Sequence, residues 1–337
     1  MRRILVVGPS WIGDTILAQP LFNLLHARHE NLGLDVLAPP WTLPLLERMP
    51  EVRRAIPSPF LHGDLKLGAR RALGRALAAG AYDQAIVLPN TFKSALVPWF
   101  ARIPRRTGYI GELRHWVLND ARRLDKEQHP RLVQRYAALG LPRGESLKPP
   151  LPALGLRIDE ATRRATLDRL GLEVGKPAVV LCPGAEYGPA KRWPARYYAE
   201  LAQGLAARGC AVWLVGSQKD RETGAEIARA AGGVCRNLCG ETGLGEAIDL
   251  IATGAITVSN DSGLMHVAAA VGRPVVALFG SSSPAYTPPH TFQATILKLD
   301  LPCSPCFKRA CPLGHFNCME QLTPGRVLAS VDFDRIS

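Results

Sequence analysis

The chain has 337 residues, of which 47% are hydrophobic and 21% charged, and its formal net charge is +12. This length is enough for two domains with a core each. No apolar run approaches the roughly 18 residues that a membrane-spanning helix needs. Gly8, Pro9 and Asp14 interrupt the first apolar run too early for a secretory signal. We therefore expect a cytoplasmic protein.

The positive charge is concentrated in the first half of the chain. Residues 1–155 hold 22 Lys+Arg against 12 Asp+Glu, a net of +10, which leaves +2 for the remainder. Such a field favours an anionic partner, namely nucleic acid, a phosphorylated glycolipid or an acidic membrane surface. A dispersed solubilising charge explains the asymmetry equally well. Because aromatic residues make up only 7%, the basic residues are not interleaved with aromatics, and we expect no nucleic-acid partner.

The chain opens with a predicted strand at 4–8, a glycine-containing turn and a helix that carries apolar residues at the helical period from Ile16 to Leu25. The turn matches neither the dinucleotide nor the P-loop fingerprint. Asp14 stands at the helix start, on the carboxyl edge of the first strand. Its carboxylate is either a helix cap or a base at the ligand-binding edge of the sheet.

Two more strands, at 34–38 and 84–88, are predicted in this half, with a helix at 66–80 between them. The strand at 84–88 opens onto a polar loop that contains Asn90 and Lys93. Three arginines follow between 102 and 106, and arginine forks match phosphate geometry. The Pro- and Gly-rich stretch 142–176, around one polar helix at 159–170, is the predicted linker.

A second series of strands and helices follows the linker. Strands are predicted at 178–182, 211–215, 255–259 and 275–279. A polar turn, residues 260–266, separates the third of these from a helix. Asp261 or Ser262 can cap that helix, Gly263 lets a ligand approach the backbone, and helix N-terminal amides suit an anion. An ordinary capped helix with a partly buried His266 is the alternative.

Both halves therefore predict the α/β class, with two Rossmann-like domains that face each other across a cleft. We expect an N-terminal acceptor-binding domain at 1–160 and a C-terminal donor-binding domain at 173–315. The last segment, 316–337, is expected to pack back across the junction.

Four motifs occur in the order of a known family: residues 8–14, 88–95, 183–194 and 260–266. They resemble the ADP-heptose:lipopolysaccharide heptosyltransferases of glycosyltransferase family 9, and the resemblance runs from residue 1 to about 290. It implies a GT-B fold and a metal-independent, inverting transfer of L-glycero-D-manno-heptose from ADP-heptose to the first heptose of the lipopolysaccharide inner core. Glu186 and Tyr187, where type I members carry threonines, make the chain most similar to type II.

The resemblance also implies roles for individual residues. Asp14 matches the catalytic base, and Lys191 matches the lysine that stabilises the leaving diphosphate. The residues implied for donor binding are Gly184, Glu186, Tyr187, Lys191, Asp220, Asp261, Ser262, Gly263 and His266. The basic first half suggests Asn90, Lys93, Arg105 and Arg106 as acceptor-binding residues.

The implied partners are ADP-heptose, a lipid A–Kdo–heptose acceptor and the cytoplasmic face of the inner membrane, where the enzyme would bind peripherally. We expect no cofactor and no metal in catalysis. The alternatives are a type I or III heptosyltransferase and, more remotely, a nucleotide-sugar 2-epimerase of similar architecture. A binding protein that holds the sugar nucleotide without turning it over is a third.

Eight cysteines fall into two groups. Cys182, Cys210, Cys235 and Cys239 lie in or beside apolar segments and are expected to be core thiols. Cys303, Cys306, Cys311 and Cys318 cluster near the end with His315, a spacing that suits structural zinc. Free, reduced thiols are slightly favoured, and the expected cytoplasmic location argues against disulfides.

Overall fold

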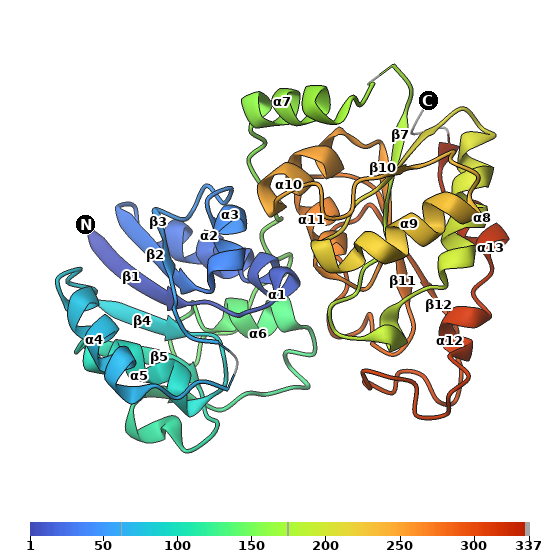
Figure 1. Ribbon diagram of the computed structural model, residues 1–337. Coiled ribbons are helices and arrows are strands. Elements are labelled where there is room, and N and C mark those ends of the chain that lie inside the picture. Colours follow the sequence, from blue (N-terminus) through green and yellow to red (C-terminus); the bar gives the residue numbers. More distant parts are fainter. Residues whose placement is uncertain (62, 174, 334–337) are drawn as a thin grey trace. The chain divides into compact units, whose positions relative to one another are not determined.

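The computed structural model describes residues 1–61, 63–173 and 175–333, and the chain divides into two compact units, Met1–Ala153 and Leu154–Ser337. Each unit contains a six-stranded sheet in which all paired strands run parallel (Figure 1). Parallel sheets are buried on both faces by the helices that connect their strands. This explains why β1, Arg2–Val7, and β7, Ala178–Cys182, are nearly continuous apolar runs.

The first unit has the strand order β3-β2-β1-β4-β5-β6. Its strands are β1, β2 (Leu32–Ala38), β3 (Arg54–Pro57), β4 (Gln84–Val87), β5 (Arg105–Tyr109) and β6 (Asp120–Arg122). Its helices are α1 (Ile12–Leu17), α2 (Gln19–Arg28), α3 (Leu43–Leu46), α4 (Leu67–Ala78), α5 (Leu96–Phe100) and α6 (Leu132–Ala138). Side chains of α4 and α5, among them Leu77, Leu96 and Val97, share one core cluster with Leu5 and Val87 of the sheet.

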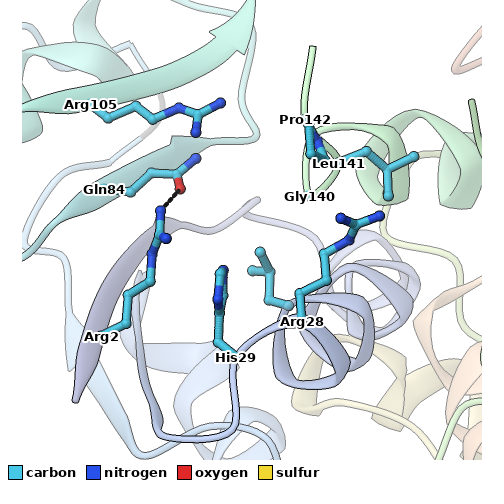
Figure 2. A pocket seen from close by; sticks show the side chains of 9 residues that line it. Arg2, Arg28, His29, Gln84, Arg105, Gly140, Leu141 and Pro142 are labelled. Carbon is cyan, nitrogen blue, oxygen red and sulfur yellow. Dashed lines mark hydrogen bonds between the residues drawn. The ribbon is translucent and has the colours of Figure 1, made fainter. Parts of the chain in front are cut away.

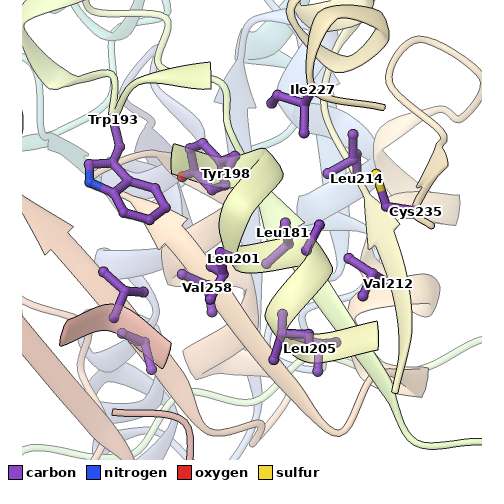
Figure 3. Close-up of a cluster of buried hydrophobic side chains, with 14 of the residues drawn as sticks. Leu181, Trp193, Tyr198, Leu201, Leu205, Val212, Leu214, Ile227, Cys235 and Val258 are labelled. Atoms are coloured by element: carbon purple, nitrogen blue, oxygen red, sulfur yellow. The ribbon is translucent and has the colours of Figure 1, made fainter. Parts of the chain in front are cut away.

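The second unit repeats this order as β12-β11-β10-β7-β8-β9. Its strands are β7, β8 (Ala211–Leu214), β9 (Arg236–Asn237), β10 (Ile256–Asn260), β11 (Val275–Phe279) and β12 (Ala294–Lys298). Its helices are α7 (Glu160–Leu170), α8 (Ala195–Ala206), α9 (Arg221–Ala230), α10 (Leu244–Thr253), α11 (Gly263–Ala270), α12 (Asn317–Glu320) and α13 (Pro324–Leu328). Figure 3 shows α8 laying Leu201 and Leu205 onto the sheet, near Val258 and Val212.

Both strand orders are those of the doubly wound Rossmann fold, so the predicted fold class is confirmed. The strands expected at 178–182 and 275–279 have these bounds. Five strands were not predicted: β3, β5, β6, β9 and β12. β5 was missed because its arginines read as a basic loop, although Arg105 and Arg106 begin a strand that buries Thr107, Gly108 and Tyr109.

Two predicted helices differ from the observed ones in instructive ways. The helix expected from Ile16 to Leu25 is interrupted at Ala18, where α1 ends and α2 begins with Pro20 in its first turn. A proline is tolerated there because the first amides of a helix have no intrahelical partner. The polar helix of the predicted linker is α7, which belongs to the second unit and packs on α10.

The end of the described chain also belongs to the second unit. α13 packs against α8, and Val327 lies in the core cluster of that unit. Residues 334–337 of the predicted C-terminal segment lie outside the described residues. Within the described ranges, every helix is too short or too polar to cross a bilayer.

Candidate functional site

The order of strands reverses between β7 and β10 in the second unit and between β1 and β4 in the first. Ligands of doubly wound folds bind outside the carboxyl ends of the strands at such a switch point. In the second unit, the segment 183–194 follows β7 and the segment 261–266 follows β10. Both predicted donor motifs therefore flank the switch point of their sheet.

Lys191 and Asp261 meet at this edge. Lys191, at the end of a short 3₁₀ turn, donates from Nζ to Oδ2 of Asp261 over 2.5 Å. The Asp261 side chain is buried, and it also accepts a hydrogen bond from Ser282 Oγ, which follows β11. Asp261 stands two residues before α11, so the ammonium group of Lys191 is bonded to the turn from which this helix starts. The ammonium group and the amides of a helix N-terminus both favour an anion there.

His266 lies one turn into α11 and is 3% exposed. Burial lowers the pKa of its imidazole to about 4; Asp261 opposes this change and Lys191 adds to it. The ring is therefore neutral near pH 7. Its Nδ1 is buried and has no hydrogen-bond partner among the described residues.

Asn260 connects the two donor segments below this cluster. Its side chain accepts from the Trp193 amide over 3.1 Å and from Tyr198 Oη over 3.1 Å. Its amide group donates to the Pro183 carbonyl over 2.7 Å. Because every polar atom of this buried side chain is engaged, the strand β10 and the loop after β7 are held in a fixed relation.

Tyr187 and Glu186 lie on the rim of the site. The Tyr187 ring lies 5.1 Å from Lys191 Nζ and 5.5 Å from the Arg309 guanidinium, and its hydroxyl donates to the Phe307 carbonyl over 2.8 Å. Glu186 forms an exposed ion pair with Lys219. The segment 307–309 thus packs against the loop that carries Lys191.

Asp220 follows β8 at the same edge. Its carboxylate accepts hydrogen bonds from the amide of Ser217 over 2.9 Å and from its hydroxyl over 2.7 Å. A Cβ on Gly184 would lie 2.6 Å from this carboxylate, so only glycine lets the two approach so closely. Gly184 and Asp220, both predicted as donor-binding residues, therefore lie side by side at this edge of the sheet.

In the first unit, Asp14 lies in the first turn of α1, directly after β1. The position at which a side chain would cap this helix is occupied by Trp11, which makes no capping hydrogen bond. Asp14 is half-buried, and it lies three residues inside the helix. A carboxylate in the first turn of a helix is favoured by the helix dipole, and it also lies at the carboxyl edge of the sheet.

The predicted acceptor loop follows β4, the other strand of this switch point. Asn90 is exposed and Lys93 is half-buried. The loop is anchored by Arg114, whose fully buried guanidinium donates to Asn90 Oδ1 over 2.6 Å, to the Tyr109 carbonyl over 2.7 Å and to the Pro89 carbonyl. Burial lowers the pKa of Arg114 to about 10, so it still carries its charge at pH 7.

The other two predicted acceptor residues, Arg105 and Arg106, are not brought to this edge. They are the first residues of β5, so they lie at the amino edge of the sheet. Arg105 pairs with Asp120 over 2.9 Å, and Arg106 donates to the carbonyls of Val117 and Ile103. The sequence predicted them as one group with Asn90 and Lys93 because the strand β5 was not recognised.

The four C-terminal cysteines line one small cavity together with His315. All four carry free thiols. Burial raises the pKa of Cys318, and Cys306, Cys311 and Cys303 raise it further. Across the described residues, no group of three or more His, Cys, Asp or Glu side chains has the arrangement of a metal site.

Three residues of the site were not predicted. Ser282 could have been found, because it stands in a polar turn after a strand next to β10. Arg309 gave no signal, since it lies in a segment notable only for its cysteines. Arg114 was passed over because a lone arginine in a basic stretch reads as a surface residue, whereas it is fully buried.

The comparisons with known proteins agree with this geometry. The profile of "Glycosyltransferase family 9 (heptosyltransferase)" matches residues 70–317. Lipopolysaccharide heptosyltransferase 2 of Escherichia coli K12 is 48% identical over 98% of this chain and 97% of its own length. The enzyme of the same description from Salmonella typhimurium LT2 is 48% identical over 97% and 96%. Lipopolysaccharide heptosyltransferase 1 of Pseudomonas aeruginosa is 28% identical over 92% and 87%.

Among solved structures, E. coli ADP-heptose lipopolysaccharide heptosyltransferase II superposes with a TM-score of 0.87 and 46% identity, over 98% of this chain and 97% of that one. An E. coli heptosyltransferase with ADP shares the fold, with a TM-score of 0.70 and 23% identity over 96% and 97%. Two parallel α/β units and these relatives together assign the chain to the glycosyltransferases with the GT-B fold. The chain belongs to glycosyltransferase family 9, the heptosyltransferases.

Proposed function

We propose that this enzyme transfers L-glycero-D-manno-heptose from ADP-heptose to the first heptose of the lipopolysaccharide inner core, the reaction of a heptosyltransferase II. The observation that carries the proposal is the 48% identity, over nearly the whole chain, to relatives described as lipopolysaccharide heptosyltransferase 2. The geometry of the two ligand edges supports it with side chains suited to each half of the reaction.

The donor half of the proposal rests on the cluster around Lys191. When the bond between the anomeric carbon and the diphosphate breaks, the electron pair leaves with the diphosphate oxygen. Lys191 and the amides at the start of α11 neutralise that charge. Asp261 holds the ammonium group in place. The Asp220 carboxylate, whose Oδ2 accepts hydrogen bonds from Ser217, would accept further hydrogen bonds from a ribose.

The acceptor half rests on Asp14. A sugar hydroxyl is a poor nucleophile, so its proton must be taken as its oxygen attacks the anomeric carbon. In our proposal the Asp14 carboxylate takes that proton. One displacement with one new C–O bond inverts the anomeric centre, and no covalent intermediate is needed. Asn90 and Lys93, on the loop that Arg114 anchors, would contact the acceptor.

We propose further that catalysis requires no metal ion, because Lys191 and the helix amides supply the positive charge that a cation supplies in other transferases. Activity should survive dialysis against EDTA and should not rise on adding Mg²⁺. A loss of activity on dialysis that Mg²⁺ restores would show that this charge is insufficient.

The acceptor is lipid-linked, so we propose that the enzyme works at the cytoplasmic surface of the inner membrane without spanning it. The net charge of +10 in the first half supports attraction to an anionic surface. Sedimentation with vesicles that contain phosphatidylglycerol, compared with phosphatidylcholine vesicles, tests this location.

One experiment decides the main proposal. The enzyme is incubated with ADP-heptose in three parallel reactions, whose acceptor is a core that carries no heptose, one heptose or two heptoses. The masses of the products are measured by mass spectrometry. A gain of one heptose only on the mono-heptosylated core is the expected result. Transfer to the heptose-free core would identify a heptosyltransferase I instead. Loss of ADP-heptose without an acceptor would point to an epimerase or a hydrolase.

A further inference from the structure

A basic cavity lies at the amino edge of the first sheet, opposite the carboxyl edge that carries Asp14. It has a volume of about 240 Å³ and is lined by nine residues, among them Arg2, Arg28, His29, Gln84 and Arg105. Arg2, Gln84 and Arg105 are the first residues of β1, β4 and β5, three strands that are neighbours in the sheet. Parallel pairing brings their first residues to one edge, which the proposed transfer reaction does not use.

Three guanidinium groups converge on this cavity. Figure 2 shows Arg105 reaching in from β5, Arg2 from β1, and Arg28 from the far side, at the end of α2. His29, the next residue after α2, lies between Arg2 and Arg28 in this view. Asp and Glu are absent from the described residues that line the cavity.

The positive charge here exceeds the negative charge that balances it. Arg28 pairs with Glu145, and Arg105 shares the single carboxylate of Asp120 with Arg122. Arg2 makes one side-chain hydrogen bond, to the neutral Gln84 over 3.5 Å. Among the residues that the structure describes, the four arginines Arg2, Arg28, Arg105 and Arg122 thus face the two carboxylates of Glu145 and Asp120. Burial lowers the pKa of His29, and the charges of Arg2 and Arg28 lower it further, as expected in a positive field.

The guanidinium of Arg2 has a hydrogen-bond donor that is not used. Its Nε is buried and has no hydrogen-bond partner among the described residues. A buried donor without an acceptor is costly, more so on a charged group. The carbonyls at and just after the end of α6, those of Ala138 and Leu141, accept hydrogen bonds from Arg122. An anion in the cavity would supply the missing acceptor.

We propose that this cavity is a binding site for a phosphate group, separate from the site for the sugar nucleotide. Phosphate offers several acceptor oxygens and matches the planar fork of a guanidinium. The site would take either a free small phosphate compound or the headgroup of a phospholipid, and both present the same chemistry to Arg2 and Arg28.

The test uses the full-length enzyme and isothermal titration calorimetry at constant ionic strength, with inorganic phosphate and glucose 6-phosphate as probes. Arg2→Gln and Arg28→Gln remove two guanidinium groups that are proposed to bind phosphate. Arg71→Gln is the control, because it removes an exposed arginine of α4 outside the cavity. Lys191→Ala is included because phosphate could also bind in the donor site. Vesicles of phosphatidic acid, compared with phosphatidylcholine vesicles, test the lipid headgroup as the source.

Saturable binding of one phosphate should be retained in Arg71→Gln and Lys191→Ala and weakened about tenfold or more in Arg2→Gln and Arg28→Gln. The phosphate affinity of Arg2→Lys, which keeps the charge but loses the planar fork of the guanidinium, should lie between the affinities of the wild type and Arg2→Gln. Binding of the soluble probes identifies a free anion, and binding of phosphatidic acid vesicles alone identifies a headgroup. If Arg2→Gln does not fold, Arg28→Gln decides. Unchanged affinity in the folded variants, or no saturable binding by any probe, would overturn the proposal.

Discussion

Lys191 is the cation of the proposed donor site, and its ammonium group is held by the carboxylate of Asp261. Asp261 accepts a hydrogen bond from the ammonium group and is itself held by a hydrogen bond from Ser282 Oγ, and the Tyr187 ring lies 5.1 Å from Lys191 Nζ. An ammonium held in advance costs little reorganisation when charge develops on a leaving group. Its effect should therefore appear in turnover more than in substrate affinity.

We predict that Lys191→Ala lowers kcat about 100- to 1,000-fold while the KM for ADP-heptose changes only a few fold. Steady-state kinetics with varied donor measures both. Lys191→Arg serves as a control, because it keeps the charge, and should retain more activity than the alanine variant. A rise in KM with unchanged kcat would show that Lys191 binds ground state and transition state equally.

Asp14→Asn tests the proposed base. Asparagine keeps the size and the hydrogen-bonding capacity of the side chain but cannot take a proton, so kcat should fall about 10²- to 10⁴-fold. The melting temperature and the affinity for ADP should stay near the wild-type values. Turnover close to wild type would eliminate Asp14 as the base. Early melting would instead assign it a structural role.

His266 makes stability depend on pH, and the sign follows from its lowered pKa. The folded state holds the imidazole neutral down to about pH 4, whereas the unfolded chain binds a proton below about pH 6.5. The unfolded state thus binds more protons between these values, and the free energy of unfolding decreases as pH falls through this window.

We predict that His266→Gln weakens this dependence by up to about 1.4 kcal/mol per pH unit between pH 6 and pH 4. Urea denaturation at several pH values measures it, and the difference between wild type and variant isolates the one group. Equal slopes for the two proteins would show that the imidazole titrates normally in the fold.

At the scale of elements, the site is built from loops that follow neighbouring strands and are fixed by buried polar side chains. Asn260 connects the loops after β7 and β10, and Arg114 performs the same task for the loop after β4. Such a buried side chain fixes a loop only while all its hydrogen bonds are made.

Arg114→Leu should raise the KM for the acceptor and leave the KM for ADP-heptose unchanged, because the anchored loop belongs to the first unit. It should also reduce the free energy of unfolding by at least about 2 kcal/mol, since Asn90 Oδ1 and buried carbonyls lose their donor. Arg71→Gln, on the surface of α4, is the control. A variant with normal acceptor KM would separate Arg114 from acceptor binding.

At the scale of the whole molecule, the charge is divided unequally between the two units. The first unit carries nearly all of the net positive charge, whereas the second is close to neutral. A positive field of this kind attracts a phosphorylated acceptor over distances up to the Debye length, about 8–10 Å at physiological salt.

The KM for a phosphorylated core acceptor should therefore rise as NaCl is increased from about 0.05 to 0.5 M, and the KM for ADP-heptose should rise less. A dephosphorylated acceptor provides the control, since it should show a weaker dependence. If the donor KM responds more strongly than the acceptor KM, the acceptor is not bound by the first unit.

The sequence by itself determined the class of fold and which polar turns lie at the carboxyl edges of the sheets. A short continuous apolar run such as 178–182, bounded by turn residues, is typical of a buried parallel strand, and the polar turn after such a strand lies at the carboxyl edge of the sheet. Lys191 and Asp261 were predicted for one site from their motifs, 70 residues apart. Strands without this pattern, such as β5 and β12, were missed because polar residues mask them.

Only the tertiary structure decided which charged side chains lie together and which are buried. Arg105 and Arg114 look alike in a basic stretch, yet one begins a strand at the amino edge and the other is fully buried beneath the loop at the opposite edge. The order of strands in a sheet and the burial of a side chain arise from contacts between distant segments. Local residue patterns therefore cannot specify them.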